Sequence, residues 1–146
     1  MGNYWTNAVR HPEDVGVGHI RRTIRFDGTN VGTTGIPIGA LEAGAVPYHA
    51  QVTVIDAFNA ATTNALTLGT ASTPEAFAAA AGTVAGTAGF KGNLTGSETG
   101  KPLATNTVVY ARYTQSGAAA TAGSAIVTLY FVNKREIEGR AFPNNP

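Results

Sequence analysis

Residues 107–132 read TVVYARYTQ, SGAAATAG and SAIVTLYFV, and this alternating segment is predicted to form the core of the molecule. Two runs rich in β-branched and aromatic residues flank a loop of small residues. In the second run, Ala125, Val127, Leu129 and Phe131 share one face. A period of two with Val, Tyr, Phe and Thr predicts strands and not helices. The opposite face of this run is also largely apolar, which predicts a central strand covered on both sides.

The loop between the two runs is too short to hold a crossover helix. The two strands are therefore predicted to be antiparallel neighbours that form a hairpin. The predicted fold class is all-β: an antiparallel β-sandwich, jelly-roll-like, with one short helix and extended N- and C-terminal arms.

Length and composition limit the classes of function. The chain has 146 residues, no cysteine, a formal net charge of +1 and only 13% charged residues. A chain of this length can form one domain that buries roughly 70% of its unfolded surface. The absence of cysteine excludes disulfides, Cys-ligated zinc and thiol catalysis. The low charge disfavours binding to nucleic acid and suits dry contact with another protein, or an ordinary domain with a polar, uncharged surface.

Both ends of the chain are predicted to be extended arms outside the folded domain. We predict an N-terminal arm at 1–18, a β-sandwich domain at 19–133 and a C-terminal arm at 134–146. Trp and Tyr are favoured at protein interfaces, so the aromatic residues of the arms either anchor a neighbouring subunit or pack on their own domain. The predicted capsid or subunit contacts are Tyr4, Trp5, Arg10, Arg21, Arg25 and Phe142.

The middle of the chain is predicted to contain further strands and one helix. Strands are predicted at His19–Phe26, with a basic face that either pairs with an acidic partner or blocks edge aggregation, and at Val46–Phe58 and Ala65–Gly69. Ile36–Leu41, with a proline, is predicted to be an edge strand or a connection. Thr73 as N-cap and Pro74 at the first position predict a helix over Ser72–Ala81. Residues 83–106 are predicted to form a short strand at Thr83–Val84 and then a long loop.

No motif for catalysis or cofactor binding is present in the sequence. Of the three histidines, His11 lies on the N-terminal arm, His19 precedes arginines that disfavour its protonation, and His49 has no carboxylate at ladder spacing. Gly100-Lys101 is followed by Pro102, so it is not a phosphate-binding loop. No apolar run approaches the roughly 20 residues that span a bilayer. We therefore expect a protein that is not an enzyme, with no catalytic, cofactor-binding or metal site and no membrane partner.

Two segments carry a resemblance to a known group. Residues 52–69, VTVIDAFNAATTNALTLG, followed by STPEAF, and residues 110–130, YARYTQSGAAATAGSAIVTLY, resemble small capsid decoration (cement) proteins of tailed bacteriophages. The resemblance implies a β-sandwich or jelly roll on the outer surface of the virion capsid, after assembly in the host cytoplasm. It also implies the major capsid protein as partner and a homo-oligomer (dimer or trimer). The low charge, separately, gives the expectation of no nucleic-acid partner.

Other functions fit the same composition. Tail, head–tail joining and fibre-base proteins of phages are similar in composition. A glycan-binding β-sandwich is a further alternative, in which Tyr110, Tyr113 and Tyr130 stack on sugars. The opposing interpretation is that these tyrosines pack within the sheets.

Overall fold

The computed structural model describes residues 17–133 of the chain. These residues form seven strands and one short helix, in the order β1 (Val17–Arg25), β2 (Ile36–Leu41), β3 (Val46–Asp56), β4 (Thr63–Gly69), α2 (Ala80–Thr83), β5 (Gly89–Leu94), β6 (Thr107–Ser116) and β7 (Ser124–Val132).

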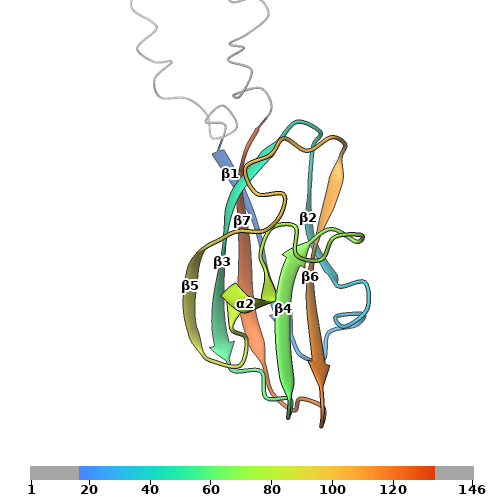
Figure 1. Cartoon of the computed structure of the whole chain (residues 1–146), viewed down its shortest axis with the longest axis vertical. Coiled ribbons are helices and arrows are strands. Elements are labelled where there is room, and N and C mark those ends of the chain that lie inside the picture. The colour runs from blue at the N-terminus through green and yellow to red at the C-terminus, as the bar shows by residue number, and fades with distance from the viewer. Residues whose placement is uncertain (1–16, 134–146) are drawn as a thin grey trace, which may run out of the picture.

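The strands form two antiparallel sheets that face one another (Figure 1). The four-stranded sheet has the order β1-β7-β3-β5, and the three-stranded sheet has the order β2-β6-β4. The prediction of an antiparallel all-β sandwich with one short helix is confirmed.

Alternating residues of both sheets fill the space between them. Val127 of β7 lies between Arg22 of β1 and Val52 of β3, and both valines are fully buried. Leu66 and Leu68 of β4 are both buried in the core. Inward-facing residues of this kind drive folding through the apolar area that they remove from water. The largest fully buried side chains are those of Tyr113, Phe58, Phe77, Ile24, Leu66, Leu68 and Leu129.

The predicted hairpin at residues 107–132 is wrong, although both of its strands exist. β6 is the middle strand of the three-stranded sheet, whereas β7 lies between β1 and β3 in the other sheet. Residues 117–123 therefore cross from one sheet to the other. This crossing is held by Asn59, whose Oδ1 accepts hydrogen bonds from the backbone N–H groups of Thr121 (2.8 Å) and Ala122 (3.0 Å). The prediction that the second run is a central strand is confirmed, but the prediction that both of its faces are covered is wrong, because among residues 17–133 only the three-stranded sheet packs on it, from one side.

The predicted helix at Ser72–Ala81 is also wrong, because tertiary pairing overrides its local signals. The N–H groups of Phe77 and Ala78 both donate to the carbonyl of Leu68 at 2.9 Å, which places this segment along the edge of β4. Of the predicted helix, Ala80 and Ala81 alone are helical, at the start of α2 (Ala80–Thr83). The strand predicted at Thr83–Val84 is the end of this helix. Part of the predicted loop is strand β5, which pairs with β3.

A β-bulge changes the predicted faces of β3. In a strictly alternating strand, Tyr48 would share a face with Ala50, Val52 and Val54. The register shifts between Pro47 and His49, so Tyr48 leaves the alternation and lies beside the rings of His49 and Tyr130.

Candidate contact surfaces

The outer face of the four-stranded sheet carries the side chains that alternate with the core residues. We call this surface the outer A face. It is built from rows of residues that the strand register places side by side. Its principal members are His19, Arg21, Thr23, His49, Gln51, Thr53, Phe90, Ile126, Thr128 and Tyr130.

One row of the outer A face carries two apolar side chains, the half-buried Ile126 and the exposed Phe90. Thr23, Ile126, Thr53 and Phe90 lie opposite one another across all four strands. Phe90 is 63% exposed, and Ile55, the next outward residue of β3, is 51% exposed. Large apolar side chains left in solvent beside a polar rim are typical of surfaces that bind other proteins.

A second row is aromatic. The rings of His49 and Tyr130 stack with centroids 4.7 Å apart, and the ring of His19 lies 5.8 Å from that of Tyr130. The Tyr130 hydroxyl donates to Oε1 of Gln51 at 3.1 Å, which fixes the ring on the sheet surface. Stacked rings of this kind give the face a rigid patch at one end.

Two of the predicted contact residues lie on the same face. Arg21 and Arg25 are exposed on the outward side of β1, and Nε of Arg25 lies 3.2 Å from Oδ1 of Asp27. Arg22 points the other way, and its guanidinium donates to the carbonyl of Pro37 at 2.8 Å, which links the edges of the two sheets. The remaining predicted contacts, Tyr4, Trp5, Arg10 and Phe142, lie outside the described residues.

The described chain begins and ends at the same end of the outer A face. Val17 of β1 is the register partner of Val132 of β7, and Figure 1 shows the two strand ends together. The segments that precede and follow the described residues are therefore attached side by side, next to the ring cluster of His19 and Tyr130.

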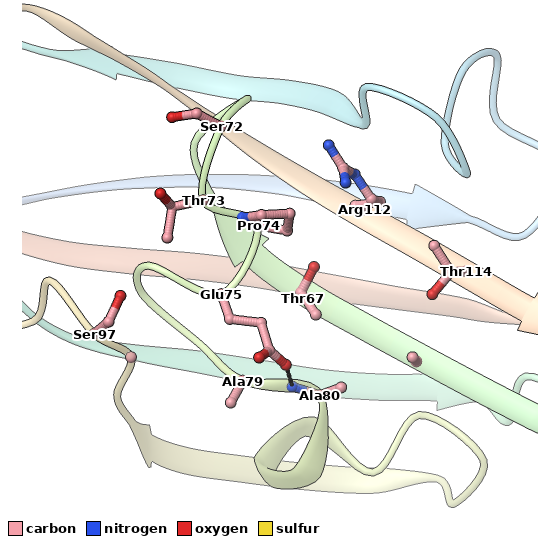
Figure 2. A pocket seen from close by; sticks show the side chains of 12 residues that line it. Thr67, Ser72, Thr73, Pro74, Glu75, Ala79, Ala80, Ser97, Arg112 and Thr114 are labelled. Carbon is pink, nitrogen blue, oxygen red and sulfur yellow. Dashed lines mark hydrogen bonds between the residues drawn. The ribbon is translucent and has the colours of Figure 1, made fainter.

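A second candidate surface is a hollow of about 640 Å³ over the outer face of β4 and β6 (Figure 2). Thr67 of β4 and Arg112 of β6 are register partners on its floor. The turn containing Pro74 forms one wall, and Thr114 and Ser97 stand on the exposed rim.

Two polar atoms of this floor lack a hydrogen-bond partner among the described residues: Oγ1 of Thr67 and Nε of Arg112. Both atoms are shielded from solvent, although the guanidinium of Arg112 also reaches the carbonyl of Thr34 at 3.4 Å. A buried polar group without a partner costs about 1–3 kcal/mol, so natural folds rarely leave one without a reason.

Neither surface is arranged for metal chemistry. Within residues 17–133, no three His, Asp or Glu side chains gather closely enough to hold a metal ion. No helix in that range is long and apolar enough to cross a membrane.

Comparison with known proteins finds a similarity of structure but none of sequence. No family model matches the sequence, and no curated protein matches it. The fold is similar to that of a chain in a phage capsid. The similar chain belongs to the capsid asymmetric unit of the cyanophage Pam1, with a TM-score of 0.60 and 22% sequence identity, over 80% of this chain and 84% of that chain.

The three tyrosines proposed to stack on sugars differ in burial and in the sheet to which they belong. Tyr113 is 1% exposed, and its ring packs 4.4 Å from that of Phe58, so it cannot meet a sugar. Tyr110 and Tyr130 are half-buried on opposite sheets. Burial raises the pKa of the Tyr113 phenol, and the backbone contact with Ala60 offsets part of the increase. The three tyrosines therefore do not form one platform.

The hollow and the row that contains Phe90 were not predicted from the sequence. Alternation in residues 107–115 does place Arg112 on the face opposite Tyr113, and alternation in 65–69 places Thr67 opposite Leu66. The sequence pattern does not show that β4 and β6 are neighbours; the structure does. Phe90 lies in a segment whose glycines gave no strand signal.

Proposed function

We propose that this protein is a structural component of the virion of a tailed bacteriophage, a decoration protein that binds the major capsid protein on the outer surface of the head and stabilises the shell. The observation that carries this proposal is the likeness of fold to a chain of a phage capsid asymmetric unit, over most of both chains. The sequence resemblance to decoration proteins supports the same role, and so do the low charge and the absence of a catalytic motif.

The outer A face is the part of the domain that we assign to the capsid contact. It carries the exposed apolar residues Phe90 and Ile55 and the predicted contacts Arg21 and Arg25. Both arms start from one end of this face, because β1 and β7 are neighbours. A face and two linked arms that bind together gain affinity, since each later contact is effectively intramolecular. We infer that the protein acts as a dimer or trimer, without enzymatic activity.

The location of the protein in the virion tests this proposal. Heads and tails of the phage that encodes the chain are separated on a density gradient, and the protein is quantified in each by mass spectrometry. We expect it to sediment with heads, in fixed proportion to the major capsid protein, and to be accessible to protease on intact particles. Sedimentation with tails would instead support a tail or joining role and would contradict the decoration function.

A further inference from the structure

Strand β5 forms one edge of the four-stranded sheet, beside β3 (Figure 1). Its sequence, GFKGNL, carries a single charged residue, Lys91. We propose that Lys91 is an edge guard, a side chain whose charge prevents β5 from pairing with β5 of a second copy of this chain. The proposal concerns a strand edge and not the outer A face, so it goes beyond the capsid contact and stands whether or not the protein binds a capsid.

The first support is that the edge of β5 is open, whereas the other sheet edges are connected to neighbouring elements. Arg22 of β1 donates to the carbonyl of Pro37 in β2 at 2.8 Å, which connects those two edge strands. Leu68 of β4 exchanges backbone hydrogen bonds with Ala78 at 3.1 and 2.9 Å. Within residues 17–133, the backbone of β5 has hydrogen bonds with β3 and from the side chain of Lys91, and none with a further strand or turn.

The second support is that an open edge of this kind fits a copy of itself. Unpaired N–H and C=O groups along an edge strand can pair with a strand of another molecule. Two identical strands that pair antiparallel obey twofold symmetry, which is the commonest symmetry of homo-oligomers. Apart from Lys91, β5 offers no charge that opposes such pairing, and the exposed ring of Phe90 would add apolar area to it. A second copy is therefore the partner that Lys91 has to exclude.

The third support is the position of the Lys91 side chain. Its register partner on β3 is the fully buried Val52, so Lys91 leaves β5 on the side that faces the core. The side chain then runs back along the strand, because Nζ donates to the carbonyls of Thr87 (2.9 Å) and Gly89 (3.4 Å). A strand added beside β5 would cover this side chain, and removing an ammonium from water without a carboxylate partner is strongly unfavourable. Two copies of β5 would also bring their lysines together, where like charges repel.

The backbone limits the edge to a stretch that one charge can control. Gly89 has a φ of 129° and Asn93 a φ of 54°, and both values lie outside the extended range of a strand. The regular part of the edge therefore lies between these two residues, with Lys91 near its centre. Any register of pairing over this short stretch includes Lys91, so the strand needs no second charge.

The test compares the self-association of full-length variants by analytical ultracentrifugation over a series of protein concentrations. Lys91→Val removes the charge and leaves a β-branched residue that suits a strand, so this variant should self-associate at least about tenfold more tightly than the wild type and form larger species. Lys91→Arg keeps the charge and should match the wild type. Lys101→Val is the matched control, because it removes an exposed lysine that pairs with Glu98 (3.6 Å) outside the strands, and it should also match the wild type. An unchanged oligomeric state of Lys91→Val, or an equal change in Lys101→Val, would overturn the proposal.

Hydrogen exchange of the backbone amides gives a second, independent readout. Lys91→Gln keeps a long side chain with a hydrogen-bond donor and removes only the charge, so it tests the proposal even if valine disturbs the fold, which circular dichroism at low concentration checks. In both variants, the amides of residues 89–93 should exchange more slowly at high protein concentration than at low, whereas those of the wild type should exchange equally at both. Association without protection of residues 89–93 would place the new contact elsewhere and contradict the proposal. A folded Lys91→Gln variant with the oligomeric state of the wild type would contradict it as well.

Discussion

Tyr113 combines full burial with a polar contact in the core. Its hydroxyl donates to Oδ1 of Asn64 at 2.6 Å, and this oxygen also accepts from the N–H of Ala60 at 2.9 Å. The contact ties β6 to Asn64 of β4 and, through Asn64, to Ala60 in the segment that leads into that strand. Tyr113→Phe should lower the free energy of unfolding by about 0.5–1.5 kcal/mol, the usual net value of one such bond. Urea unfolding at neutral pH measures this change, and a variant as stable as the wild type would show that the contact is not stabilising.

The pH dependence of stability reports on the same residue. Because burial raises the pKa of Tyr113 above the ordinary value of 10.0, the folded state prefers the neutral phenol. Its contribution is complete below pH 10 and is lost as the pH rises through the folded-state pKa. The wild-type free energy of unfolding should therefore fall more steeply above pH 10 than that of Tyr113→Phe, in parallel urea titrations. Equal slopes would contradict the assignment.

The turn after β4 is the element that replaces the predicted helix, and it depends on close backbone contact. A Cβ atom at Gly69 would collide with the carbonyl oxygens of Thr73 and Pro74, which are backbone atoms and cannot turn aside. Gly69→Ala should therefore destabilise the fold by about 1–3 kcal/mol. Gly86→Ala is the matched control, because the nearest atoms to its new Cβ lie 3.8 Å away. Urea unfolding of both variants tests this, and similar stabilities would contradict the packing of the turn.

At the scale of the whole molecule, the proposed capsid contact has two separable parts, the arms and the outer A face. Deletion of residues 1–15 should abolish binding to capsids and leave the β fold intact, because the described domain packs its own core. Co-sedimentation with capsids measures binding, and circular dichroism measures the fold. Full occupancy by the truncated protein would show that the N-terminal arm is not needed.

The outer A face is tested by its most exposed aromatic residue. Phe90→Ser should change the stability of the isolated protein by less than about 0.5 kcal/mol, since Phe90 is 63% exposed. It should weaken capsid binding at least about fivefold if Phe90 lies in the interface, which corresponds to about 1 kcal/mol. Val108→Ser is the matched control, because Val108 is 43% exposed but lies on the other sheet. Equal losses in both variants would contradict the assignment of the face.

Local pattern predicted most of the strands but not their neighbours. Alternation in residues 124–132 placed Ala125, Val127 and Leu129 on one face, and all three are buried in the core. The sheet to which β6 and β7 each belong depends on pairing with distant strands, which alternation does not encode. β5 has the sequence GFKGNL, with little strand propensity, and is held by its pairing with β3.

The candidate sites were less predictable than the fold. Arg21 and Arg25 were identified from the basic face of one strand, and the structure places both on an exposed surface. The hollow requires the register between Thr67 and Arg112, a turn that replaces a predicted helix, and the absence of partners for two atoms. Each of these features arises from tertiary contacts, so no pattern within a single segment of the sequence predicts the hollow.

The pairing of Val17 with Val132 also bears on how the chain folds. β1 and β7 are the first and last strands within residues 17–133, so their ladder joins residues more than a hundred positions apart and raises the contact order of the fold. A circular permutant that links β7 to β1 through a short linker, and opens the chain at the exposed residues Thr87 and Ala88, would turn this ladder into a local hairpin. Low contact order speeds folding, so stopped-flow refolding of the permutant should be faster than that of the natural chain.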